Sequence, residues 1–454
     1  MPAGVARPRL GRPGRRPGGG AHGRLTNGDR WVVTESLAPE RVNRVPLWRR
    51  RDFALLWGGQ TIGEFGIRAS AVVVPLLAAD TLRAGVFQVS LLTAAAWLPY
   101  LFFSLPAGLV ADRFDQRRLM ICCDLGRAAL LASVPAVALV GRLTLPFLYV
   151  VVGLNGVLTV FFTVAYKSLL PRLVSADRLI EGNARLTVSE DAAQLVGPAV
   201  GGALAGVVGG GRTLLGTTLA FLVSAVTLGL IRPPAPARPV SGRPVPARVA
   251  VTEGLGFVRG HPILLATLLC ATMSNFFGVA TTALEVPYLL RELHAAPAVV
   301  GVVVSAGAVG GLLAGALADR IAARVGSARL IWVAMAVPGP LYLLMPAARP
   351  GWGLLLYAVG LAAYSANGVL FNVALVSYRQ RVTPPELLGR VTAAFVWICF
   401  GVVPFGALFG GALGSTWGMR PALVVTALGT WSAALFVVGS PLRTMRDLPP
   451  SHPG

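Results

Sequence analysis

The chain has 454 residues, of which 55% are hydrophobic and 13% are charged, and its formal net charge is +21. Soluble domains carry about a quarter charged residues, so this composition excludes an ordinary globular protein. The basic excess would suggest nucleic-acid binding in a soluble protein. Here the basic residues follow the loops between apolar segments, which indicates a membrane protein with no nucleic-acid partner.

The first 51 residues are unlike the rest of the chain. They contain twelve arginines against three acids, are rich in Gly and Pro, and have no apolar core. Such a segment is neither a signal peptide nor a folded domain. We expect residues 1–51 to form a disordered cytoplasmic tail, for which contact with anionic lipid is one use.

Twelve apolar runs follow, each long enough to cross a bilayer core, which takes about 20 helical residues. Barrel strands would be shorter and would alternate polar with apolar residues, so helices are the better interpretation. The sequence therefore predicts an all-α membrane protein with twelve transmembrane helices. We expect them at 53–79, 89–111, 119–140, 147–169, 186–208, 212–231, 263–290, 298–318, 328–346, 353–376, 391–414 and 421–440.

The polar segment between the sixth and seventh runs divides the chain into two halves. Residues 232–261 carry six prolines and five arginines, and end in a short helical pattern at 253–257. We expect a cytoplasmic linker there, between six-helix bundles at 52–231 and 262–441, with a cytoplasmic tail at 442–454. A repeat supports two similar halves, because Gly-Leu-Val-Ala-Asp-Arg at 108–113 matches Gly-Ala-Leu-Ala-Asp-Arg at 315–320, 207 residues later.

The distribution of charge predicts the orientation. Thirty-two of the forty basic residues lie in segments expected on one side, and each of the six loops expected on the other side has one. The positive-inside rule then places the N- and C-termini in the cytoplasm of a multi-pass cell (inner) membrane protein.

The repeated loop motif predicts a conformational latch. Its glycine permits close helix approach, its aspartate ends a helix at the cytoplasmic face, and its arginines can bridge to acids or helix C-termini on another element. Plain topology charges are the alternative, which the recurrence of the spacing makes weaker. The latch residues are Gly108, Asp112, Arg113, Arg117, Arg118, Gly315, Asp319, Arg320 and Arg324.

This motif resembles the loop signature of the major facilitator superfamily. The run Gln-Leu-Val-Gly-Pro-Ala-Val-Gly-Gly at 194–202 is similar to that family's antiporter signature, carried here by Gly197, Pro198, Gly201 and Gly202, although Ala193 replaces its first glycine. Four further patterns resemble the macrolide-efflux branch of drug:proton antiporters: Leu-Trp-Gly-Gly-Gln at 56–60, Asp-Leu-Gly-Arg-Ala at 124–128, Glu-Gly-Asn at 181–183 and Leu-Gly-Arg-Val at 388–391. The resemblance spans residues 52–441 and implies the major facilitator fold, alternating access and export.

Charged residues inside the spans are candidates for proton coupling. A charge at the bilayer centre costs about 2.5–3.5 kcal/mol, so each calls for a partner or a wet cavity. Glu64 and Arg68 are four residues apart, and Asp124 and Arg127 are three apart, so each pair can meet on one helix face. They either line the central cavity or neutralise each other for structure alone. We expect Glu190 and Asp191 to be interfacial.

Three amides lie within apolar spans, and each can bind substrate or join two helices by a hydrogen bond. These substrate-cavity candidates are Asn155, Asn275 and Asn372. Aromatic residues can add a stacking surface for a lipophilic molecule, although such residues more often face lipid or core.

The sequence does not contain the residue patterns that other classes of function require. The only lysine, Lys167, is not in a phosphate-binding loop, and no His, Cys or acid cluster has the spacing of a metal or catalytic site. We therefore expect no enzyme, no cofactor and no metal. The sequence predicts a secondary transporter, proton-coupled and exporting a lipophilic small molecule such as a macrolide-like drug or natural product. The alternatives are a siderophore or lysolipid exporter of the same fold, and a non-transporting membrane receptor or assembly protein. Nothing specifies an assembly, so a monomer is the working expectation.

Overall fold

The computed structural model describes residues 46–175, 178–232 and 247–447. Residues 1–45 of the expected N-terminal tail, 233–246 of the expected linker and 448–454 of the expected C-terminal tail therefore lie outside the described residues. Within the described part, twelve helical segments are long and apolar enough to cross a membrane. All twelve coincide with the apolar runs of the sequence, so the prediction of twelve spanning helices is confirmed.

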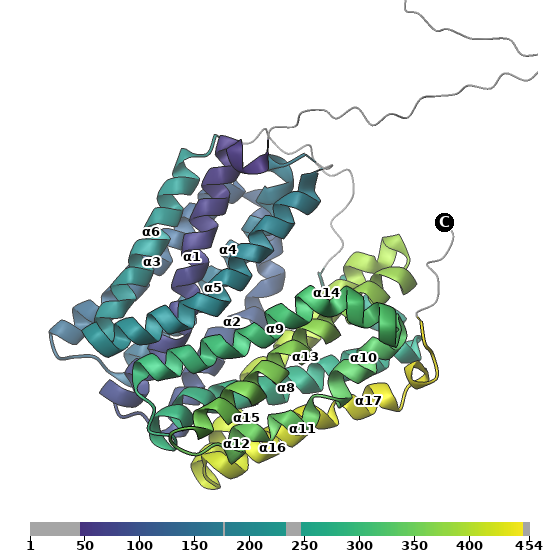
Figure 1. The fold of residues 1–454 in the computed structure, drawn as a ribbon. Helices are drawn as coiled ribbons and strands as arrows, with labels where there is room; N and C mark the ends of the chain where they lie inside the picture. The colour runs from purple at the N-terminus through teal and green to yellow at the C-terminus, as the bar shows by residue number, and fades with distance from the viewer. Residues whose placement is uncertain (1–45, 176–177, 233–246, 448–454) are drawn as a thin grey trace, which may run out of the picture. The chain divides into compact units, whose positions relative to one another are not determined.

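The first half contains six long helices (Figure 1). A short 3-10 turn, η1 (Leu47–Arg49), precedes them. A π-helical turn, η2 (Leu77–Thr81), extends the first helix just after Pro75, which has no N–H to donate. The six helices are α1 (Arg51–Leu76), α2 (Val86–Arg113), α3 (Gln116–Leu139), α4 (Leu145–Leu173), α5 (Leu179–Val208) and α6 (Gly210–Leu230).

The second half begins with a helix that the sequence predicted only in part. It is α7 (Ala247–Arg259), and it packs on α14 (Pro385–Gly401). The spanning segments follow as α8 (Pro262–Arg291), α9 (Pro297–Val325), α10 (Ser327–Ala336), α11 (Gly339–Tyr342), α12 (Leu344–Ala347), α13 (Gly353–Val382), α14 (Pro385–Gly401), α15 (Val403–Thr416), α16 (Met419–Ser432) and α17 (Ala434–Val438), with a final 3-10 turn, η4 (Pro441–Arg443).

Three of the spans in this half are interrupted rather than continuous. The ninth is split into α10, α11 and α12, and Pro338 and Pro340 lie at the first break. The eleventh is split into α14 and α15 beside Pro404, and the twelfth into α16 and α17 at Ala433. Proline removes a backbone donor and disturbs the preceding turn. This accounts for the break between α10 and α11 and for the break between α14 and α15.

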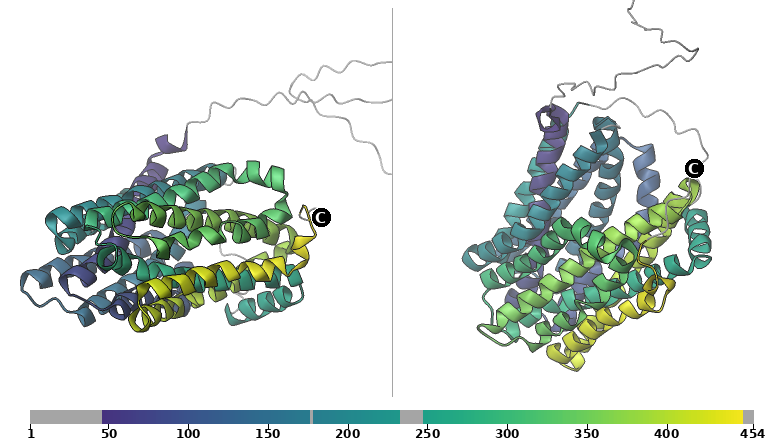
Figure 2. Two further views of the ribbon diagram at one scale, coloured as in Figure 1. Left: turned by 60° about the horizontal axis from the view of Figure 1, so that its bottom comes forward. Right: turned by 45° about the vertical axis from the view of Figure 1, so that its right-hand side comes forward.

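Each half has its own packing. In the first, α1 contacts α5 and α6, and α4 lies against α2 and α3. In the second, α9 contacts α13, and α8 lies against α15 and α16. The halves meet where α5 contacts α9 and α2 contacts α15 (Figures 1 and 2). Large apolar side chains remain exposed on these helices, for example Val150, Leu219 and Leu313, as is expected of surfaces that face lipid.

Candidate functional site

The first candidate group lies on α1. Glu64 Oε2 is 3.6 Å from Arg68 Nε, one turn along the helix, and Gln60 Nε2 donates to Glu64 Oε1 at 3.4 Å. The Glu64 side chain is 15% exposed, whereas that of Arg68 is 37% exposed. The spacing of four residues places these groups on one helix face. Glu64 is thus partly buried and contacts Gln60 on one side and Arg68 on the other, whereas Arg68 is more exposed.

Two acids of α5 lie close to this pair. Glu190 is within electrostatic range of Glu64, Arg68 and Lys167, and Asp191 is within range of Arg68. Both acids lie about three turns into α5, which begins at Leu179. Glu64, Glu190 and Asp191 therefore all lie within electrostatic range of Arg68, and Lys167 is a second basic group near Glu190.

A pocket opens beside these acids, between α4 and α5. Its polar lining comes from Tyr166, Lys167, Asn183, Thr187 and Glu190, and the rest of the wall is apolar. The pocket thus combines apolar walls with one charged side chain of each sign, Lys167 and Glu190.

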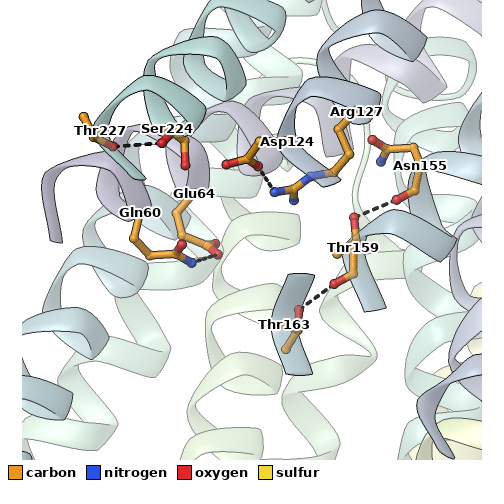
Figure 3. A network of polar contacts seen from close by, with 9 residues as sticks. All are labelled: Gln60, Glu64, Asp124, Arg127, Asn155, Thr159, Thr163, Ser224 and Thr227. Carbon is orange, nitrogen blue, oxygen red and sulfur yellow. Dashed lines mark hydrogen bonds and ion pairs between the residues drawn. The ribbon is translucent and has the colours of Figure 1, made fainter. Parts of the chain in front are cut away.

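The second candidate group is a fully buried ion pair on α3. Asp124 is 0% exposed and Arg127 is 1% exposed, and Arg127 Nη2 donates to Asp124 Oδ1. The guanidinium carbon of Arg127 lies 4.2 Å from the ring centroids of both Phe162 and Phe221, so two aromatic faces enclose it. Ser224 faces Asp124 from α6 (Figure 3).

A polar ladder on α4 lies next to this pair (Figure 3). Thr159 Oγ1 donates to the Asn155 carbonyl oxygen at 2.8 Å, and Thr163 Oγ1 donates to the Thr159 carbonyl oxygen at 2.8 Å. The buried Asn155 Oδ1 has no hydrogen-bond partner among the described residues. Asn155 therefore retains an acceptor on the Arg127 side of α4.

The other two candidate amides differ from Asn155. Asn275 Nδ2 donates to the Ala271 carbonyl oxygen of its own helix at 3.0 Å, while Asn372 is exposed. The structure instead buries Asn367, which is 1% exposed. Asn367 was not among the predicted residues, because an apolar run does not show which of two amides five residues apart on one helix is buried.

The two copies of the latch motif differ in their contacts. In the first copy, Arg117 Nε donates to the Leu228 carbonyl oxygen at 2.7 Å and its Nη2 donates to that of Gly229, so it binds the C-terminal end of α6. Gly108 has no atom within 4 Å of the position a Cβ would take. Side-chain contacts of Asp112 lie outside the described residues. Arg113 and Arg118 are exposed, as are Gly315, Asp319, Arg320 and Arg324 of the second copy.

The antiporter-like run of α5 forms a seam with two neighbours. An ideal Cβ on Gly201 would lie 2.8 Å from the Ala69 carbonyl oxygen of α1. One on Gly202 would lie 2.6 Å from the Pro297 carbonyl oxygen and 2.9 Å from Gly301 Cα, both on α9. Real Cβ contacts are essentially never so short, so glycine is required for this approach of α5 to α9.

A hydrogen bond crosses the same seam. Ala199 N–H, just after Pro198, donates to Ser305 Oγ of α9 at 3.0 Å. At the same end of the two halves, Arg291 of α8 donates to the carbonyl oxygens of Ala79 and Ala84 in the first half. Figure 1 shows the two groups of helices separating away from this end.

Enlarging Gly202 tests the seam. We expect Gly202→Val to lower the free energy of unfolding by about 1–3 kcal/mol, because its methyl groups would collide with the α9 backbone. The measurement is thermal unfolding of purified protein in detergent. Gly216→Val on α6 is the matched control, since nothing lies within 4 Å of its Cβ position. An equal loss in both variants would mean that helix propensity, not the seam, sets the cost.

Comparison with known proteins places the chain in a family. The sequence profile of the Major Facilitator Superfamily matches residues 56–405. Multidrug efflux pump Tap of Mycolicibacterium fortuitum is 26% identical over 369 residues, which cover 79% of this chain and 88% of that protein. Macrolide efflux protein A of Streptococcus pyogenes is 23% identical over 379 residues, which cover 81% of this chain and 91% of that protein.

A solved structure agrees on the fold. A bacterial homologue of the human lysosomal transporter Spinster, in an inward-facing and occupied conformation, matches with a TM-score of 0.69 at 15% identity, over 87% of this chain and 97% of that one. The prediction of an all-α membrane protein with two six-helix repeats is thus confirmed, and so is the resemblance stated from the motifs. The chain belongs to the major facilitator superfamily, and it is a multi-pass membrane transporter of a small molecule rather than an enzyme.

Proposed function

We propose that this transporter exports a lipophilic, cationic or neutral small molecule, such as a macrolide-like drug or natural product, in exchange for protons. The relatives named as multidrug and macrolide efflux proteins support export. The observation that carries the proposal is the partly buried Glu64 carboxylate, which pairs with Arg68 at 3.6 Å and lies within electrostatic range of Glu190. The Glu190 carboxylate in the lining of a partly apolar pocket offers a partner for a lipophilic cation.

Coupling follows from competition for Glu64. When Glu64 is deprotonated, its carboxylate pairs with Arg68 at 3.6 Å. Protonation neutralises the carboxylate and removes its electrostatic attraction to Arg68. A cationic substrate and a proton both neutralise the same carboxylate, so the entry of one favours the release of the other. Exchange of the two across the membrane then requires only that the site face each side in turn.

The seam between α5 and α9 is the second part of the proposed cycle. In the proposed orientation, with both termini in the cytoplasm of a cell-membrane protein, the joined ends of the two halves face outward. The hydrogen bond from Ala199 to Ser305 and the contacts of Arg291 must break for the outer side to open.

The proposed orientation rests on the charge distribution and can be checked directly. We expect a reporter fusion after Gly260 to signal the cytoplasm and one after Glu292 to signal the outside. The reverse pattern at both positions would contradict the proposal.

Flux measurements test the function itself. The full chain is reconstituted into vesicles loaded with ethidium, a fluorescent lipophilic cation, and a pH gradient is imposed at zero membrane potential. We expect efflux against the ethidium gradient, and its collapse on addition of a protonophore. Flux of ethidium that ignores the pH gradient would exclude proton coupling, and no flux would favour a siderophore or lysolipid substrate, or a non-transporting receptor, each of which can be assayed with its own ligand.

A further inference from the structure

Glu285 is a buried acid that the proposed mechanism does not use. It lies on α8, six residues before that helix ends at Arg291, and the residue is 6% exposed. Its Oε1 has no hydrogen-bond partner among the described residues, and no basic group among them acts on its carboxyl. Glu64 and Asp124, by contrast, each have an arginine on the same helix.

Tyrosines from two helices surround Glu285. On α13, the titratable side chains within electrostatic range of Glu285 are Tyr357 and Tyr364. Tyr288, one turn further along α8, stacks on Tyr357 with ring centroids 5.8 Å apart. Arg420 of α16 and Glu292 pair with each other at 3.7 Å and act on Tyr288 rather than on Glu285. None of the other described helices packed on α8 brings a charged group to this carboxyl.

The tyrosines continue into a polar track inside the second half. The side chain of Asn367 lies at the buried hydroxyl of Tyr342, and the hydroxyl of Tyr357 is buried without a hydrogen-bond partner among the described residues. Tyr342 packs edge-on against Tyr364 with ring centroids 5.9 Å apart, and Asn367 is one turn beyond Tyr364 on α13. The side chain of Tyr364 reaches α8 itself, since its hydroxyl occupies the space a Cβ on Gly278 would need.

An unpaired carboxylate in such a place has no compensation for its lost hydration, whereas the neutral acid needs only one acceptor. Ionisable residues kept inside membrane helices generally serve transport of ions or substrate. A bound metal ion is the weaker interpretation, because no group of three His, Cys, Asp or Glu side chains suited to a metal occurs among the described residues. The proton is the cation that one carboxyl can bind alone.

We propose that Glu285 is a second proton carrier of the transport cycle, separate from Glu64. This rests on the proposed function, since it adds a proton to the exchange suggested for Glu64. In each cycle the carboxylate gains a proton from one side of the membrane, forming an O–H bond, and loses it to the other side. No oxidation or reduction accompanies the step.

The steady-state ratio of the ethidium concentrations on the two sides of the membrane depends on how many protons are exchanged per ethidium. At zero membrane potential and a gradient of about one pH unit, each proton exchanged per ethidium raises the limiting ratio about tenfold, since tenfold corresponds to about 1.4 kcal/mol. We expect Glu285→Gln to lower the ratio reached by wild-type vesicles about tenfold. Glu292→Gln is the matched control, because the same substitution is made in an exposed acid near the end of the same segment.

The outcomes separate the two proposals. If wild type accumulates ethidium against its gradient and Glu285→Gln reaches the same ratio, the second carrier is overturned and the proposed function stands. If wild type shows no response to the pH gradient, the proposed function fails and this proposal fails with it. A response to a sodium gradient that is lost in Glu285→Gln would make this a sodium site and would also overturn the proton carrier.

A second measurement covers the case in which Glu285→Gln does not fold. The infrared spectrum of the wild type at neutral pH should contain the C=O stretch of a neutral carboxylic acid, and Glu285→Asp should shift it. A wild-type spectrum with no carboxylic acid band that responds to Glu285→Asp would overturn the proposal.

Discussion

Glu64→Gln is expected to reduce uphill, pH-gradient-driven efflux to the level of vesicles without protein. Glutamine keeps the length and the hydrogen-bonding capacity of the side chain but cannot bind and release a proton. It also leaves Arg68 without the carboxylate 3.6 Å away, so the competition between substrate and proton disappears. The measurement compares the two proteins at equal folded amounts in vesicles loaded with ethidium under an imposed pH gradient.

Two further results complete this experiment. Glu253→Gln is the control, because it removes a carboxylate that pairs with Arg390 at the surface of α7, away from the spanning helices. It should transport like the wild type. If Glu64→Gln still drives uphill efflux at the wild-type rate, Glu64 is not the coupling residue, and Asp124 becomes the next candidate.

A purely structural role for Glu64 predicts a different result. If the Glu64–Arg68 pair served stability alone, Glu64→Gln would mainly reduce the folded fraction. Arg68 would then lack its partner inside a spanning helix, where a charge at the bilayer centre costs about 2.5–3.5 kcal/mol. Comparison at equal folded amounts separates such a loss of stability from a loss of coupling.

The architecture was accessible from the sequence because it depends on one strong physical requirement. A span must be apolar over about 20 residues, and its backbone must be hydrogen-bonded internally. This requirement gives the number of helices and their order. It does not give the breaks at Pro338 and Ala433, because the chain composition on both sides of a break remains apolar.

The sequence could predict contacts of the candidate site only between residues that are close together in the chain. The pairing of Asp124 with Arg127 and of Glu64 with Arg68 follows from spacing along a helix, and both pairs form. The approach of Glu190 and Asp191 to Arg68 depends on where α5 begins and on how it packs against α1, which no local pattern contains.

The orientation of side chains on α13 shows the same limit. Asn367 and Asn372 are five residues apart, so they point in directions about 140° apart around the helix. One is buried in the second half and the other is exposed. Hydropathy gives no preferred face here, because the apolar residues of this span surround the helix on all sides. The burial of Tyr357 on the same helix could not be predicted for the same reason.

Asp124→Asn is expected to destabilise the protein by about 3–5 kcal/mol, the usual cost of breaking a buried ion pair from one side. Arg127 would remain charged and 1% exposed, with its Nε and Nη1 already lacking partners among the described residues. The rings of Phe162 and Phe221, each 4.2 Å from the guanidinium carbon, offset part of this cost, since a desolvated cation–π contact contributes about 2 kcal/mol.

The double variant Asp124→Leu with Arg127→Met separates stability from coupling. Replacing both charges by apolar side chains of similar size should restore stability to within about 1 kcal/mol of the wild type, because the buried pair then has no uncompensated member. Thermal unfolding in detergent measures this, and Glu292→Gln, which breaks an exposed pair at 3.7 Å, is the control with little expected effect. If Asp124→Asn is as stable as the wild type, Arg127 is neutralised by another group. If the double variant folds and still performs gradient-driven efflux at the wild-type rate, neither residue carries the proton, and the role of the pair is to hold α3 against α4 and α6.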